Sequence, residues 1–491
     1  MAELTILRSG ERFAHTFNPP RPLSDVLAES GFVIPHPCGG RGVCGKCAVQ
    51  LKGAVSPPTA EERKAGTRLS CQAMLLGDAE VTLPEARAME QIAGGARAVK
   101  PVAPMPGDLG AAVDIGTTTL ALALYDLRTG AALGEAGMLN PQTAVAADVM
   151  GRIGAALGGR LEEMRGQVTG AVRALLQEAC ARAGAAPEDV ASLVVTGNTT
   201  MLYLLTGRSP EALSHAPFSA DCLFDETLPL GGKTVYLPRC MHAFVGADIT
   251  CAVLAAGQCE SGEVSLLCDA GTNGELALWK DGVLHVTSTA AGPAFEGAGI
   301  SCGCGSVRGA IDRVWVEDGA IRVHTIGDAP AVGICGSGLI DAVSAALKLG
   351  LVDETGAMDD DDLPLSNGVA LLPKDIRAVQ LAKAAIAAGI ETLLESAGVS
   401  EDDVRTLYIA GGFGSHLDVG SAAAIGLFPA SLAGRAKVLG NAALAGAARL
   451  LLDMPEQERT RGIAALARHV DLGGNPKFNE HYMDQMFFPE E

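Results

Sequence analysis

The sequence predicts a multidomain α/β protein in which a small cysteine-bearing domain precedes two related α/β halves. The chain has 491 residues, which is too many for a single hydrophobic core. Cysteines gather in a glycine-rich loop near the start, and an apolar strand followed by a D-x-G-T turn and a second strand occurs twice further along. We therefore expect a first domain at 1–85, a linker at 86–108, and two halves at 109–262 and 263–491.

Four cysteines of the first domain have a spacing typical of iron–sulfur ligands. The loop PHPCGGRGVCGKC contains Cys38, Cys44 and Cys47, and Cys71 follows in RLSCQ. Three thiolates in one loop and a distant fourth suit a [2Fe-2S] cluster. A structural zinc site more often pairs two C-x-x-C motifs, and only one is present here. These four cysteines are the predicted metal ligands, and the glycines among them allow the loop to adopt positive φ angles.

The residues around this loop predict a small domain rich in strands. LTILRSGERFAHTF predicts a hairpin, residues 23–30 predict a short helix, and AVQLK and AEVTLP predict later strands. This order resembles the β-grasp ferredoxins, and the gap of five residues between Cys38 and Cys44 is similar to that of the adrenodoxin type. The resemblance covers about the first 85 residues and implies a ferredoxin domain.

Composition limits the partners and the compartment. The formal net charge of −20 argues against nucleic-acid and anionic-membrane partners, because both require a basic face. No basic-then-apolar leader opens the chain, and no apolar run reaches the ~18 residues that span a bilayer. The 13 cysteines form no regular framework beyond the first domain, so disulfides are not expected. We expect a cytoplasmic protein.

The linker at 86–108 is rich in Ala, Gly, Arg and Pro, which predicts an extended tether. After it, the turn DIGTTT places Gly116, Thr117 and Thr118 where amides and hydroxyls can bind a phosphate. Asp114 in the same turn can hold Mg²⁺ through water. Many hairpins contain a similar turn, so this one alone is a weak sign.

The pattern is repeated in VSLLCDAGTNGELALW, where Asp269 takes the place of Asp114. An internal repeat of this kind implies two similar halves whose turns face each other across a cleft. The second turn adds Gly271, Thr272 and Asn273 as candidate nucleotide ligands, and Glu275 and Glu296 as candidates for orienting a water molecule.

A third motif, LYIAGGFGSHLD, follows an apolar strand with Gly411, Gly412 and Phe413. DIGTTT, DAGTNGE and IAGGFG, in this order, resemble the phosphate-1, phosphate-2 and adenosine motifs of the acetate and sugar kinase, heat-shock chaperone and actin superfamily. The resemblance implies two ribonuclease-H-like α/β halves that form an actin-like ATPase binding ATP and Mg²⁺. It implies that Asp114 and Asp269 are the Mg²⁺-side carboxylates, and that the third motif borders the adenosine.

A one-electron carrier and a nucleotide switch on one chain suit an acceptor of lower potential than the cluster, because a downhill transfer needs no ATP. The pairing resembles the reductive activators of corrinoid enzymes, and the resemblance extends to TGNTTM, GICGSGLID and the tail PKFNEHYMDQMFFP. It implies ATP-dependent, one-electron reduction of inactive cob(II)alamin to Co(I) on the corrinoid protein of a methyltransferase system. It also implies an electron donor, either a reductase or a ferredoxin, and a homodimer. Little sequence separates the tether from the first turn, so little room remains for a separate middle domain.

Other interpretations remain open on the sequence. A small-molecule phosphotransferase with a fused redox domain would use a carboxylate such as Asp248 as general base. A redox-sensing, chaperone-like binder would form complexes without delivering electrons. An activator of a radical 2-hydroxyacyl-CoA dehydratase is disfavoured, because that family shares one cluster between two subunits. Cys302 and Cys304 are most simply buried thiols, and a second metal pair is the less favoured alternative.

Overall fold

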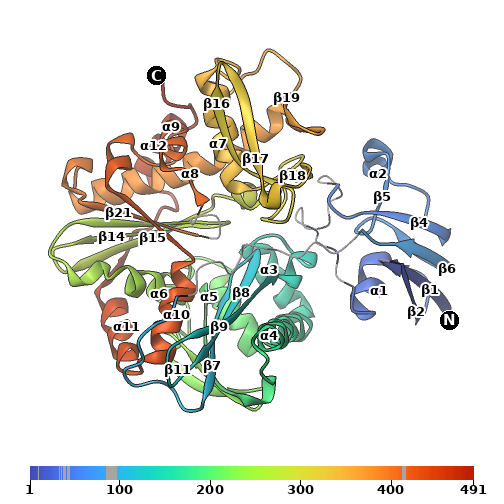
Figure 1. The fold of residues 1–491 in the computed structure, drawn as a ribbon, viewed down its shortest axis with the longest axis horizontal. Coiled ribbons are helices and arrows are strands. Elements are labelled where there is room, and N and C mark those ends of the chain that lie inside the picture. The colour runs from blue at the N-terminus through green and yellow to red at the C-terminus, as the bar shows by residue number, and fades with distance from the viewer. Residues whose placement is uncertain are drawn as a thin grey trace. The chain divides into compact units, whose positions relative to one another are not determined.

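The computed structural model describes residues 1–8, 10–32, 34, 36, 40, 42, 45–84, 97–411 and 416–490, and the chain divides into two compact units (Figure 1). Unit 1 comprises Met1–Ala88 and Pro141–Ala155, and unit 2 comprises Met89–Asn140 and Ala156–Glu491. In the described part of the chain, no helix is both long enough and apolar enough to cross a membrane.

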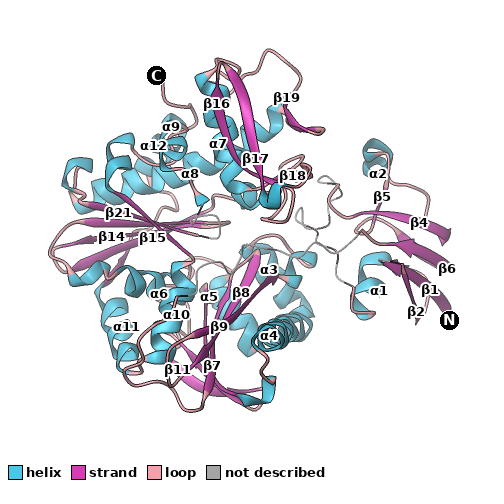
Figure 2. Cartoon of the chain, viewed as in Figure 1, coloured by secondary structure: helices cyan, strands magenta, loops and turns pink. Residues whose placement is uncertain are grey.

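Unit 1 is built on a mixed sheet with strand order β2-β1-β6-β4-β5, to which β3 adds beside β6 (Figure 2). β1 pairs antiparallel with β2 and parallel with β6. Because alternate residues of a strand face the same side, Leu4 and Ile6 of β1 are both fully buried, in one core with Leu23 and Leu27 of α1. The elements are β1 Ala2–Arg8, β2 Glu11–Phe17, β3 Arg21–Pro22, α1 Leu23–Glu29, β4 Ala48–Val55, α2 Ala60–Ala65, β5 Arg68–Leu69 and β6 Met74–Thr82. The predicted hairpin, helix and later strands are confirmed.

Unit 1 also contains the segment Pro141–Ala155, which includes α3 Val149–Ala155. Arg152 of α3 is fully buried and donates hydrogen bonds to Ala146 O at 3.1 Å and Gln142 Oε1 at 3.3 Å. These bonds compensate the guanidinium for its lost hydration and fold the segment on itself.

Unit 2 contains two sheets that repeat one topology (Figure 2). Their orders are β11-β12-β10-β7-β8-β9 and β22-β21-β13-β14-β15-β23. In each sheet three consecutive strands form an antiparallel meander, and two later strands add in parallel on one side of it. The first sheet consists of β7 Leu109–Ile115, β8 Thr119–Asp126, β9 Ala132–Leu139, β10 Val190–Gly197, β11 Glu226–Leu230 and β12 Lys233–Leu237. The second consists of β13 Ser265–Ala270, β14 Gly274–Lys280, β15 Val283–Thr289, β21 Thr406–Ala410, β22 Ala436–Gly440 and β23 Ala467–His469. The predicted internal repeat is therefore confirmed.

Helices α6 Ala247–Ala256 and α10 Ala442–Leu452 lie between the two sheets (Figure 1). Their apolar residues share one core with both sheets, so that Val194 of β10 and Leu267 of β13 belong to the same cluster. The remaining elements are α4 Leu161–Ala183, α5 Thr199–Thr206, β16 Ala310–Glu317, β17 Ala320–Thr325, β18 Gly333–Ile334, α7 Gly336–Lys348, β19 Leu363–Ser366, β20 Val369–Leu371, α8 Pro373–Ala397, α9 Val419–Ala424, α11 Pro455–Leu466 and α12 Pro476–Asp484. The shared core fixes the two halves of unit 2 against each other.

The described part of the expected linker, residues 97–108, is extended but is not free. Val99 N donates to Gly130 O at 3.0 Å, and Met105 N donates to Leu451 O at 2.9 Å. Met105 is buried in the shared core, although the surrounding composition contains no periodic apolar pattern. This half of the linker is thus attached to unit 2, and residues 85–96 lie outside the described residues.

We expect Gly446→Ala to destabilise unit 2, because a Cβ at Gly446 of α10 would lie 2.0 Å from Cys251 O of α6. Overpacking of two closely approaching helices costs about 3 kcal/mol, which thermal unfolding measures as a lower midpoint. The matched control is Gly462→Ala in α11, where a Cβ meets no atom within 4 Å and alanine favours the helix by about 0.5 to 1 kcal/mol. Equal midpoints for the two variants would contradict the close approach.

Candidate functional site

Two of the four predicted cluster ligands come together in unit 1. Cys47 Sγ and Cys71 Sγ are 3.3 Å apart, with Cys47 buried and Cys71 partly exposed. The hydrogen bond between the two thiols is the largest influence on Cys47 and outweighs burial, so the pKa of Cys47 is lowered to about 6. Because the thiolate is the form that binds metal, this pair fits the sulfur ligands of a cluster. Cys38 and Cys44 lie outside the described residues.

Hydrogen bonds join the cysteine loop to the segment of Cys71. Gln72 Nε2 donates to Gly40 O at 2.6 Å and lies 3.8 Å from Cys71 Sγ, and Ser70 N donates to Cys47 O at 2.9 Å. Gly40, Gly42 and Gly45 have φ angles of 76°, 75° and 68°. Glycine adopts such angles at no steric cost, so for these three residues the predicted backbone geometry is confirmed.

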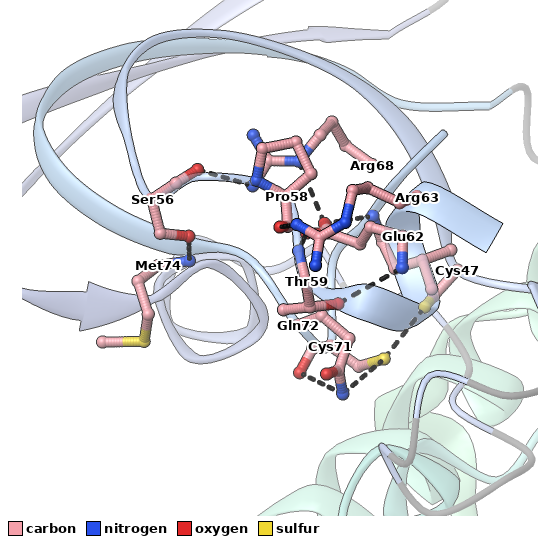
Figure 3. A network of polar contacts seen from close by, with 11 residues as sticks. Cys47, Ser56, Pro58, Thr59, Glu62, Arg63, Arg68, Cys71, Gln72 and Met74 are labelled. Atoms are coloured by element: carbon pink, nitrogen blue, oxygen red, sulfur yellow. Dashed lines mark hydrogen bonds and ion pairs between the residues drawn. The ribbon is translucent and has the colours of Figure 1, made fainter. Parts of the chain in front are cut away.

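Glu62 of α2 fixes the segment that leads to Cys71 (Figure 3). Its carboxylate is 1% exposed and accepts hydrogen bonds from Leu69 N at 2.9 Å, Thr59 N at 2.9 Å and Arg68 Nε at 3.0 Å. Three donors, one of them charged, make a buried carboxylate tolerable. The position of Cys71 therefore depends on a polar network that the cysteine spacing does not reveal.

The second site is a pocket in unit 2, where both D-x-G-T turns meet the N-terminal ends of α6 and α10. Its lining comes from seven separate stretches of the chain: Asp114, Gly116, Thr117, Thr119, Asn198, Asp248, Asp269, Gly271, Thr272, Asn273, Glu275, Glu296, Gly411, Asn441 and Ala443. Most of the predicted nucleotide residues are thus brought together. Thr118 joins them through a hydrogen bond to Thr272, whereas Gly412 and Phe413 lie outside the described residues.

The first turn has a shape that only glycine permits at one position. Gly116 N donates to Thr119 O at 2.9 Å, and a Cβ at Gly116 would lie 2.7 Å from that same oxygen. The two turns touch, because Thr118 Oγ1 and Thr272 Oγ1 are 2.7 Å apart. Each half therefore presents a tight turn with amides and hydroxyls to the same point of the pocket, which is an arrangement suited to phosphate.

Two asparagines of the pocket were not predicted from the sequence. Asn441 Nδ2 donates to Asp114 Oδ2 at 2.9 Å, and Asn198 Nδ2 donates to Thr117 Oγ1 at 3.0 Å. Each also caps a helix, since Asn441 Oδ1 accepts from Leu444 N and Asn198 Oδ1 accepts from Met201 N. A Gly-Asn pair that ends a strand and opens a helix, in TGNTTM and LGNAAL, was the signal that would have found both.

The pocket brings several buried carboxyl groups together. Burial raises the pKa of Asp114 to about 6. Burial, followed by the neighbouring carboxylates, raises the pKa of Asp269 to about 7 and that of Asp248 to about 8, and it raises the pKa of Glu275 well above its usual range. A divalent cation would relieve this crowding. Among the described residues no three His, Cys, Asp or Glu side chains are close enough to ligate one ion together. The carboxylates therefore fit Mg²⁺ held through water and substrate phosphates, which is its usual mode of binding.

The other cysteine pair, Cys302 and Cys304, lies in unit 2. Cys302 packs against the main core of unit 2, and Cys304 packs against a small cluster around Val307 and Cys335. Among the described residues, no group of three or more His, Cys, Asp or Glu side chains around this pair could hold a metal ion. Both residues are partly exposed rather than fully buried, and the choice between structural thiols and a second metal pair stays a prediction.

Fold and site together define a protein that joins a ferredoxin-like domain to a nucleotide-binding domain of the acetate and sugar kinase, heat-shock chaperone and actin (ASKHA) type. Residues 8–76 match the family model described as "2Fe-2S iron-sulfur cluster binding domain". Residues 109–260 match "RACo middle region", and residues 263–491 match "C-terminal domain of RACo the ASKHA domain". The middle region thus coincides with the half that carries the first turn.

Individual relatives agree with these matches. The chain is 34% identical over 417 residues to "Corrinoid activation enzyme RamQ" of Eubacterium limosum, covering 77% of this chain and 70% of that protein. It is 30% identical over 295 residues to "[Co(II) methylated amine-specific corrinoid protein] reductase" of Methanosarcina barkeri, covering 55% and 54% of the two chains. The solved structure "Reductive activator for corrinoid,iron-sulfur protein" aligns over 99% of both chains with a TM-score of 0.74 and 26% identity. The chain belongs to the RACo-like family of corrinoid activation enzymes.

We expect Asp248→Asn to stabilise unit 2 at high pH in the absence of divalent cations. An unfolded aspartate has a pKa near 4, so stability is lost as the pH rises from about 4 through the folded-state value of about 8. At pH 8 the neutral amide should raise the free energy of unfolding by about 1 to 3 kcal/mol, and at pH 5 by much less.

Thermal unfolding in EDTA at pH 5 and pH 8 measures this difference. Asp360→Asn, at an exposed position, serves as the control and should change neither midpoint. A gain for Asp248→Asn that does not depend on pH would show that charge burial is not the cause.

Proposed function

We propose that this protein reactivates the corrinoid protein of a methyltransferase system by one-electron reduction of inactive cob(II)alamin to Co(I), with hydrolysis of ATP. One observation carries the proposal: a single chain combines converging cysteine thiols in a ferredoxin-like domain with a pocket formed by two phosphate-type turns. The names of the relatives support the corrinoid protein as the acceptor. The domain limits 1–85, 86–108, 109–262 and 263–491 remain part of the proposal.

In unit 1, Cys38, Cys44, Cys47 and Cys71 would hold a [2Fe-2S] cluster, which when bound supplies one electron at a time. Cys47 contributes a thiol whose pKa is already lowered to about 6. Gln72 and Glu62 keep Cys71 in place through the contacts described above. These contacts all lie within unit 1.

In unit 2, the turns around Gly116, Thr117 and Thr118 and around Gly271, Thr272 and Asn273 would bind the phosphates of ATP. Asp114, oriented by Asn441, and Asp269 would hold Mg²⁺ through water. Glu275, which lines the pocket and is 7% exposed, is the proposed residue that orients the attacking water, and a bound cation would lower its raised pKa. Gly411, Gly412 and Phe413 are proposed to border the adenosine.

The role of ATP follows from energetics. Reduction of an acceptor below the potential of the electron carrier is unfavourable by a factor of ten for each ~59 mV. Closure of two halves around a nucleotide supplies a few kcal/mol of differential binding, enough to favour one conformation of a partner by about two orders of magnitude. ATP would thus change the state of the corrinoid protein rather than phosphorylate a substrate.

Three further parts of the proposal are a homodimer, a reductase or ferredoxin as electron donor, and a cytoplasmic location. The cysteine pattern supports the location, because the cysteines beyond the first domain have no regular disulfide-type spacing. Sedimentation equilibrium of the purified chain tests the oligomeric state.

We expect the protein, after anaerobic reconstitution with iron and sulfide, to bleach the cob(II)alamin absorption of a Co(II) corrinoid protein only when reductant and ATP are both present. Cys71→Ser should lose the visible cluster spectrum and this activity while binding ATP like the wild type, because Cys71 and the pocket belong to different units. Cys259→Ser, which changes a half-buried thiol of unit 2, should keep the spectrum.

Two results would contradict the proposal. One is reduction at the same rate without ATP, which would remove the coupling. The other is transfer of labelled phosphate from ATP to small acids or sugars, which would favour the phosphotransferase.

A further inference from the structure

The carboxylate of Glu296 accepts hydrogen bonds from the second turn. Its Oε1 accepts a hydrogen bond from Thr272 N at 2.8 Å, and its Oε2 accepts one from Thr272 Oγ1 at 2.5 Å. A backbone amide and a hydroxyl of a D-x-G-T turn are the groups expected to bind a phosphate oxygen. The carboxylate of Glu296 therefore has the charge and the partners of a bound anion.

The same carboxylate also reaches the first turn. Thr118 Oγ1 donates to Glu296 Oε2 at 3.4 Å, and Thr118 Oγ1 lies 2.7 Å from Thr272 Oγ1. Both threonines are less than 10% exposed, so these bonds form away from bulk water. Glu296 thus joins the two halves at the point where their phosphate-type turns meet.

The backbone holds Glu296 in this position. The residue ends the short 3₁₀ helix η6 Pro293–Glu296, whose Phe295 is 1% exposed in the main core. A Cβ at Gly336 would lie 1.9 Å from Phe295 O, and Gly292 N donates to Thr272 O at 2.9 Å. The carboxylate is therefore carried on packed backbone directly against the turn, and it is not a mobile surface group.

We propose that Glu296 is an internal competitor of the nucleotide: its carboxylate occupies the position of a phosphate group that contacts both turns, and ATP binds only by displacing it. The inference rests on the proposed function of the pocket as an ATP site. A carboxylate and a phosphate oxygen cannot share the same donors, because both are anions and each needs the Thr272 amide hydrogen. Displacement also breaks the bond from Thr118 to Glu296, so that phosphate replaces Glu296 as the link between the two halves. Glu296 thereby sets the affinity for ATP.

Removal of the carboxylate should tighten ATP binding. In Glu296→Ala the donors of the turn lose their internal acceptor. We therefore expect the dissociation constant for a non-hydrolysable ATP analogue with Mg²⁺ to fall about tenfold, which corresponds to the free energy of one charge-assisted hydrogen bond. Glu296→Gln keeps the side chain but makes weaker, neutral hydrogen bonds, so we expect a smaller decrease. Calorimetric titration of the full chain measures both.

The control is Glu317→Gln at the exposed end of β16, where the carboxylate pairs with Arg322 outside the pocket. This variant should bind the analogue like the wild type. If Glu296→Ala fails to fold, the Gln variant still tests the proposal.

Unchanged or weaker binding by the Glu296 variants would overturn the inference. Unchanged binding with slower hydrolysis would assign Glu296 to water orientation, and weaker binding would make it a ligand of the nucleotide complex. These outcomes differ from failure of the proposed function, in which the wild type itself would not bind the analogue.

Discussion

The packing of α6 against α10 is the contact on which the site in unit 2 depends. Gly446 lets the two helices approach until a single added methyl group would meet Cys251 O. The two sheets cover the outer faces of these helices, and residues of both helices and both sheets belong to one core. Because that core is continuous, the first turn after β7 and the second after β13 must face each other. If the two halves packed independently, nothing would hold Thr118 and Thr272 within hydrogen-bond distance.

Charge is the second constraint in this pocket. Asp114, Asp248, Asp269, Glu275 and Glu296 line one small space, and burial raises the pKa of each. Such crowding destabilises the protein by itself, and a bound cation would relieve it. The arrangement therefore gives up some stability for function, as is usual where titratable groups share a site. Glu296 differs from the other four, because two hydroxyls and an amide stabilise its charge.

In unit 1 the constraint is the fixed geometry of the cysteine ligands. A cluster site needs sulfur ligands held at fixed distances, and here glycines with positive φ, the Gln72 bridge and the buried Glu62 provide that rigidity. These contacts lie within the unit, so the electron carrier and the nucleotide pocket are built separately. Coupling between them must therefore act through conformation or through the partner protein, rather than through shared ligands.

The sequence by itself determined the features that local chemistry encodes. Cysteine spacing predicted the metal ligands. The repeated pattern of strand, D-x-G-T turn and strand predicted the internal repeat, because a turn of this kind depends on neighbouring residues such as Gly116 and Thr119. Only the tertiary structure decided which distant residues complete each site. Asn441 reaches Asp114 across 327 positions of the chain, and Glu296 reaches Thr118 across 178. Burial of Met105 in the linker and of Glu62 beside the cysteines was likewise invisible to periodicity. The physical reason is that pairing over such distances depends on how helices and sheets pack, and packing is a property of the assembled core that no short stretch of sequence contains.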